Sequence, residues 1–113
     1  MFDEVQATST EHAERAVIGA ALDDRSAIRW AAEHVTADDF SNATLGAVWT
    51  ILHARWKGGD PTDPISMDGA LRGVVPGYQP GSVFDLMNAA TIGGKAGHWA
   101  SLIAEGAKRR RAI

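Results

Sequence analysis

Residues 89–97, with the sequence AATIGGKAG, contain the residue types of a phosphate-binding loop. In such a loop, glycines let backbone N–H groups surround a phosphate, while a lysine and a following hydroxyl residue bind the phosphates and Mg²⁺. When the stretch is aligned on Gly94 and Lys95, its first position is Ala89 rather than glycine, and its last is Ala96 rather than serine or threonine. The stretch therefore does not predict a nucleotide site, and we interpret its glycines as the end of a helix.

The sequence contains no other catalytic or metal-binding pattern. There is no cysteine, which excludes a thiol nucleophile, a thiolate metal site and a disulfide framework. The four histidines, at positions 12, 34, 53 and 98, do not share the spacing of a helical metal site. We interpret Asp60 and Asp63, on either side of Pro61, as turn-forming acids rather than paired catalytic carboxylates. We expect no enzyme activity, no metal and no cofactor in this chain.

Two features favour binding instead of catalysis. The first is a set of tryptophans, and we take Trp30, Trp56 and Trp99 as candidate partner-binding residues. Trp30 lies off the apolar stripe of its predicted helix, and Trp56 lies at a helix end. Trp99 lies on an apolar stripe, as Trp49 does, so the hydrophobic core is the alternative location for Trp99.

The second feature is a basic run at the end of the sequence, formed by Lys108, Arg109, Arg110 and Arg111. The other 109 residues carry seven basic and 14 acidic side chains, and the net charge of the chain is −3. The run could bind nucleic acid or a partner, but it also suits a solvated helix face or the negative end of a helix dipole. Since the rest of the chain repels phosphates, we expect DNA contact by this chain to be weak or absent.

The elements that position these residues are predicted to be helices, so the fold class is all-α, a compact domain of several helices. Apolar residues recur with helical spacing, and no run alternates as a strand would. Thr10, Asp23 or Asp24, Thr36, Ser66 and Ser82 are the predicted N-terminal caps. The predicted helical segments are 10–22, 23–35, the short turn 36–40, 42–59, 66–72, 82–90 and 96–113.

We expect three parts in the chain: a disordered N-terminal tail over 1–9, a helical globular head over 10–95, and the start of a C-terminal helix or hairpin over 96–113. No glycine, proline or polar cap ends the last helix, so we expect it to continue into a further domain. No apolar run has the length of a membrane span and no secretory signal is present, so we expect a cytoplasmic location.

Four segments, taken in order, resemble the N-terminal domain of DnaB-type replicative DNA helicases. EHAERAVIGAAL resembles the opening helix of the family, and VTADDFSNATLGAVWTIL resembles its Asp-Asp-Phe element, with Asp39, Phe40, Val48 and Trp49 matching. KGGDPTDPISMDGAL and HWASLIAEGAKRRRAI are similar to two later elements, with Trp99 in place of a tyrosine. Ser41 replaces the usual aromatic residue, and residues 73–97 lack the usual motifs of the family.

This resemblance implies a non-catalytic helical head that precedes a helical hairpin and a separate ATPase domain. It also implies that such heads assemble as a collar on a helicase hexamer and bind other helicase subunits, primase and a helicase loader. ATP and Mg²⁺ would bind only in the ATPase domain, which these 113 residues do not contain. Two alternatives stay open: a stand-alone adaptor protein that binds a helicase or primase, and a small nucleic-acid-binding protein that uses its basic C-terminal run.

Overall fold

The computed structural model describes residues 2–90 and 96–111, which form helices and no strand. The all-α fold class predicted from the sequence is therefore confirmed over these residues. A short 3-10 helix, η1 (Ala37–Asp39), lies between the second and third α-helices. The α-helices are α1 (Phe2–Asp23), α2 (Arg25–Ala32), α3 (Ala43–Gly58), α4 (Pro64–Leu71), α5 (Ser82–Ala90) and α6 (Ala96–Arg111).

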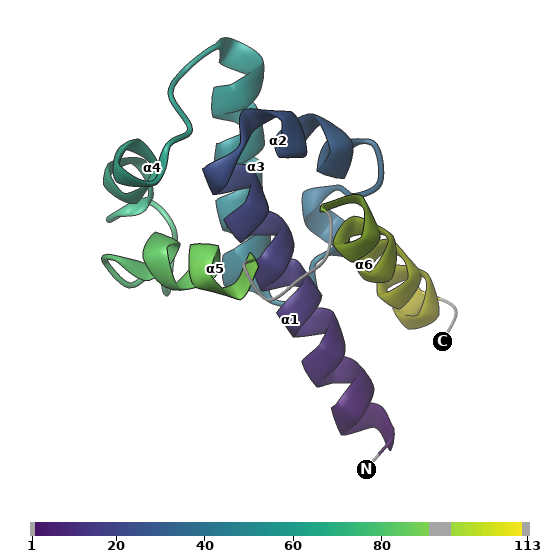
Figure 1. Cartoon of the computed structure of the whole chain (residues 1–113). Coiled ribbons are helices and arrows are strands. Elements are labelled where there is room, and N and C mark those ends of the chain that lie inside the picture. Colours follow the sequence, from purple (N-terminus) through teal and green to yellow (C-terminus); the bar gives the residue numbers. More distant parts are fainter. Residues whose placement is uncertain (1, 91–95, 112–113) are drawn as a thin grey trace.

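Helix α1 lies at the centre of the fold, and each of the five other α-helices packs against it. Helices α4 and α5 lie on one side of it and α6 on the other, while α2 crosses near its C-terminal end (Figure 1). The N-terminal end of α1 and the C-terminal end of α6 lie on the same side of the molecule (Figure 1). Because every other α-helix packs on α1, a site between the helices depends on α1 for its arrangement.

The hydrophobic core forms where these helices meet. Ile18 of α1, Trp49 and Leu52 of α3, and Ile103 of α6 are all buried. Phe40, which follows η1, is buried, and its ring stacks on Trp49 with centroids 6.1 Å apart. Burying side chains of this size stabilises a fold by about 1.5–3 kcal/mol each.

Helices α1 and α5 approach so closely that only glycine fits at Gly19. A Cβ at this position would overlap the carbonyl oxygen of Leu86 and would lie 3.1 Å from the Cβ of Ala90. The obstacle is backbone, which cannot rotate away as a flexible side chain can. Gly19 therefore sets the distance between the two helices.

Local signals predicted most of the helix starts and stops. Asp24 caps α2 by accepting a hydrogen bond from the Ser26 N–H at 2.9 Å. Thr36, a predicted cap, forms a capping box with Asp39 around η1. Gly59 ends α3 in the left-handed conformation, with φ 79°, which favours glycine.

Three predicted details of these elements are corrected. Thr10 does not begin the first helix, because α1 begins at Phe2. Helix α4 is capped by Asp63 and not by Ser66, because Pro64 favours the first helical position and leaves the cap to the residue before it. Helix α2 is shorter than predicted and ends at Ala32. Gly93 and Gly94 lie outside the described residues.

We predict that Gly19→Ala lowers the free energy of unfolding by about 1–3 kcal/mol, because the new methyl group forces α1 and α5 apart. Gly69→Ala is the matched control, since Gly69 is also helical but nothing lies within 4 Å of a Cβ there. The control should raise stability by about 0.5–1 kcal/mol through the helical preference of alanine. Urea unfolding followed by tryptophan fluorescence measures both changes, and an equal effect of the two variants would contradict the packing argument.

Candidate functional site

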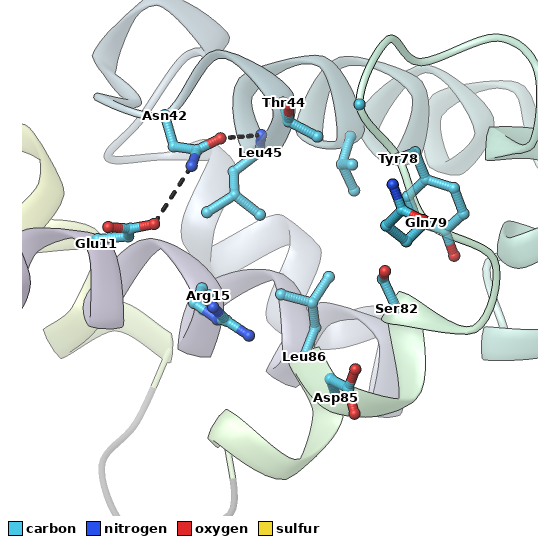
Figure 2. A pocket seen from close by; sticks show the side chains of 12 residues that line it. Glu11, Arg15, Asn42, Thr44, Leu45, Tyr78, Gln79, Ser82, Asp85 and Leu86 are labelled. Carbon is cyan, nitrogen blue, oxygen red and sulfur yellow. Dashed lines mark hydrogen bonds between the residues drawn. The ribbon is translucent and has the colours of Figure 1, made fainter.

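A cavity of about 240 Å³ opens between α1, the first turns of α3, the 76–79 loop and the start of α5 (Figure 2). Its floor includes the buried side chains of Leu45, Val48 and Leu86, while most of its other lining residues are polar. We call this cavity with its surrounding side chains the α1–α3–α5 cleft. The sequence analysis did not predict it, since its walls come from four separate segments.

The edge of the α1–α3–α5 cleft is polar and charged. Glu11 and Arg15 of α1, Gln79 of the loop and Asp85 of α5 are exposed there. Figure 2 shows Arg15 and Asp85 near Leu86, with Glu11 beside Asn42 at the other end. The cleft therefore combines three aliphatic side chains at its floor with charges of both signs at its edge.

The α1–α3 wall of the cleft depends on a buried carboxylate, Glu14. Glu14 accepts a hydrogen bond from the Ser41 hydroxyl and another from the Asn42 N–H at 3.1 Å. Asn42 in turn caps α3, because its side-chain oxygen accepts from the Leu45 N–H at 3.0 Å. The amide group of Asn42 also donates to Glu11 at 3.3 Å, so the start of α3 is bound to α1 at two points.

The loop wall of the cleft is held by a second carboxylate, Asp68 of α4. Asp68 accepts from the Tyr78 hydroxyl at 2.5 Å and from the Gly81 N–H at 2.8 Å, and it pairs with Arg72 at 2.6 Å. The Thr44 hydroxyl of α3 donates to the carbonyl of the residue before Gly77 at 3.3 Å. These contacts fix the loop against both α3 and α4.

The contact between Tyr78 and Asp68 shifts the titration of both groups. Hydrogen bonds from Tyr78 and Gly81, followed by the nearby Arg72, lower the pKa of Asp68 to about 2. Burial and the bond to Asp68 raise the pKa of Tyr78 to about 12. Asp68 therefore stabilises the fold above its unfolded pKa of 3.8, and this contribution is lost as the pH falls through about 2.

Of the candidate tryptophans, Trp30 and Trp56 do not line this cleft. Trp30 is 59% exposed on α2, as expected for a residue off the apolar stripe. Trp56 is half-buried in α3 and stacks on His53, whose ring also stacks on Trp49. Burial and then the charge of Lys57 lower the pKa of His53. Trp99 belongs to α6, but its side chain lies outside the described residues.

The basic run lies in the last turn of α6, and all four of its side chains are exposed. Two of them bind η1: Arg110 donates to the Asp39 carbonyl at 2.6 Å, and Arg111 pairs with the Asp39 carboxylate at 2.7 Å. Lys108 and Arg109 make no such contact within the described part of the chain. Two residues of the run, Arg110 and Arg111, therefore bind η1, whereas the other two, Lys108 and Arg109, are cations exposed to solvent.

No group of three His, Asp or Glu side chains among the described residues is placed to hold a metal ion. None of their helices is both long and apolar enough to cross a membrane. The sequence did not reveal the cleft or the two carboxylates, Glu14 and Asp68, that hold its walls. The position of Glu14 within the buried stripe of Ala13 and Val17 is the one signal that pointed to a buried acid.

Comparison with known proteins identifies the architecture. The family model for the DnaB-like helicase N terminal domain matches residues 6–105. The structure is similar to the crystal structure of the N-terminal domain of DnaB helicase from Mycobacterium tuberculosis, with 26% sequence identity and a TM-score of 0.75. The similarity covers 89% of this chain and 75% of that chain. No curated protein matches the chain.

We predict that Tyr78 titrates with a pKa of about 12, because its hydroxyl donates to Asp68 and is partly buried. Tyr78 is the single tyrosine of the chain, so tyrosinate absorbance near 295 nm reports this residue alone. Asp68→Asn should move the pKa toward the ordinary value of 10.0. The control Asp38→Asn, at an exposed acid of η1, should leave it unchanged.

The neutral tyrosine stabilises the fold below pH 10, and this contribution is lost as the pH rises through about 12. Circular dichroism at each pH separates titration of folded protein from alkaline unfolding. A pKa near 10 in protein that is still helical would contradict the described contact.

Proposed function

This chain belongs to the family of DnaB-like helicase N-terminal domains, and we propose that it serves a replicative helicase as a non-catalytic assembly and docking domain. The family match over residues 6–105 is the observation that carries the proposal. In this proposal the domain joins a collar with the same domain of other helicase subunits. The collar then binds primase or a helicase loader during DNA replication.

The described surface supports a binding role over a catalytic one. Its exposed large apolar side chains include Trp30, Ile65 and Phe84, and such side chains contribute strongly to protein–protein contacts when they become buried. The perturbed carboxylate, Asp68, is engaged by Tyr78, Gly81 and Arg72, so it supports the loop and is not available as a general base. In this proposal ATP and Mg²⁺ bind in a separate ATPase domain, and the chain acts in the cytoplasm.

A stand-alone adaptor for a helicase or primase is the second candidate. It would use the same fold and the same surface, so the structure favours neither form. The coding sequence after residue 113 distinguishes them, since a helicase continues into an ATPase domain with Walker A and B motifs. A stop codon with no helicase gene nearby would favour the adaptor.

A nucleic-acid-binding protein is the third candidate, and the contacts of α6 count against it. Phosphates would have to compete with Asp39 for Arg111, which pairs with it at 2.7 Å. The remaining cations of the run are Lys108 and Arg109, and the residues outside the run carry more acidic than basic side chains. Two free cations supply a small part of the six to ten phosphate contacts that give strong binding.

We predict that Trp30→Ala weakens binding to the cognate primase or loader by about tenfold or more, because an exposed tryptophan contributes strongly once a partner covers it. Isothermal titration calorimetry measures the affinity, and the melting temperature should stay unchanged. Glu105→Ala, at an exposed polar position on α6, is the control and should retain the affinity. If neither primase nor loader binds the wild-type chain, the docking proposal is wrong.

We predict that the wild-type chain shows no saturable DNA binding at physiological salt in fluorescence anisotropy. If all four residues of the run contacted phosphates, a plot of the logarithm of the binding constant against the logarithm of the salt concentration would have a slope of about −3.6. Asp39→Asn, which releases Arg111, should increase binding at low salt. Tight binding by the wild type with the full slope would instead establish the nucleic-acid function.

A further inference from the structure

We propose that the α1–α3–α5 cleft is a docking site for one apolar side chain of a partner polypeptide, flanked by one basic and one acidic residue. The basic residue would meet Asp85 and the acidic residue would meet Arg15. The inference deepens the proposed function, on which it rests for the existence of a protein partner. The cleft lies apart from Trp30, so it is a second contact surface.

The size of the cleft selects the class of ligand. Its volume is about 240 Å³, whereas pockets for cofactors and drug-sized molecules enclose about 300–1,000 Å³. A nucleotide is also disfavoured, because Glu11 and Asp85 place two carboxylates at the edge and would repel phosphates. The space suits a single side chain of the size of leucine or methionine packed on Leu45 and Leu86.

The charges at the edge select the residues that flank this apolar side chain. Arg15 and Asp85 line the same cleft, yet neither forms an ion pair or a hydrogen bond within the described residues. A nearby Arg and Asp of opposite charge would normally neutralise each other if their geometry allowed contact. Here each charge stays available, one on α1 and one on α5, and Figure 2 shows Leu86 between them in that view. A polypeptide segment with charges of both signs satisfies both groups.

The walls of the cleft are fixed before any partner binds. Asn42 caps α3, and Thr44 and Tyr78 hold the loop through hydrogen bonds of 3.3 Å and 2.5 Å. Their polar groups are thus already satisfied within the chain, and they do not compete for the ligand. A rigid site avoids the entropic cost of ordering a loop, so even a short segment can bind.

The test uses nine-residue peptides with a central leucine in a Ser-Gly background. One carries Glu before the leucine and Lys after it, and a second carries the reverse order. We expect one order to bind the 113-residue chain and to shift the ¹H–¹⁵N NMR signals of Thr44, Gln79 and Asp85. A peptide with glutamine in place of both charges should bind about tenfold more weakly, as expected for the loss of charge-assisted hydrogen bonds.

Two variants test the charge assignment. Arg15→Glu and Asp85→Lys should each weaken binding about tenfold, and because both positions are exposed the variants should remain folded. The double variant Arg15→Glu/Asp85→Lys should prefer the peptide of opposite charge order. Trp30→Ala is the control and should leave peptide binding unchanged. The absence of signal changes with either peptide up to about 10 mM, or changes centred on α2, would overturn the inference.

This experiment separates the inference from the proposed function. Peptide binding at the cleft by a chain that binds neither primase nor loader would leave the inference standing and refute the proposed function. Primase or loader binding that is unaffected by Arg15→Glu and Asp85→Lys, together with no peptide binding, would refute the inference alone.

Discussion

The buried carboxylate of Glu14 is the contact on which the arrangement of the other helices depends. A charged group without solvent is costly unless hydrogen bonds compensate it, and Glu14 is compensated by Ser41 and Asn42 at the start of α3. The N-terminal end of a helix is also where a negative charge is most favourable. The central helix α1 therefore determines where α3 begins. The residues just before that point then connect the remaining parts: Phe40 enters the core, and Asp39 binds the last turn of α6.

The α1–α3–α5 cleft follows from this constraint and from a second one at Asp68. Glu14 fixes the wall formed by α1 and α3, while Asp68 fixes the loop through Tyr78 and Gly81. Gly19 lets α5 approach α1 closely enough to complete the cleft with Leu86. The carboxylates of Glu14 and Asp68 are therefore both engaged in contacts that hold the fold together. The charges left for a partner are those of Arg15 and Asp85 at the edge of the cleft.

Features that depend on neighbouring residues could be predicted from the sequence, whereas features that depend on distant residues could not. The cap at Asp24 and the end of α3 at Gly59 are local, and the all-α fold follows from helical spacing. The caps predicted at Thr10 and Ser66 were wrong because a neighbouring residue or an uninterrupted helical run had the stronger preference. The contacts of Glu14 with residues 27 and 28 positions away, and the cleft itself, need the tertiary fold.

The same distinction explains the basic run, which carries the strongest local charge signal in the sequence. Four adjacent cations suggested one surface, but the fold brings Asp39 to two of them from 71 and 72 residues away. A helix attached in this way is not an independent arm, because its buried face, which includes Ile103 and Ala107, packs on the same core that η1 closes. The end of α6 therefore contacts η1 directly, and the residues after η1 contact the core through Phe40 and α1 through Ser41. Such a direct connection suits a domain whose proposed role is to link subunits and partners, since docking on the other helices and the position of α6 then depend on one junction.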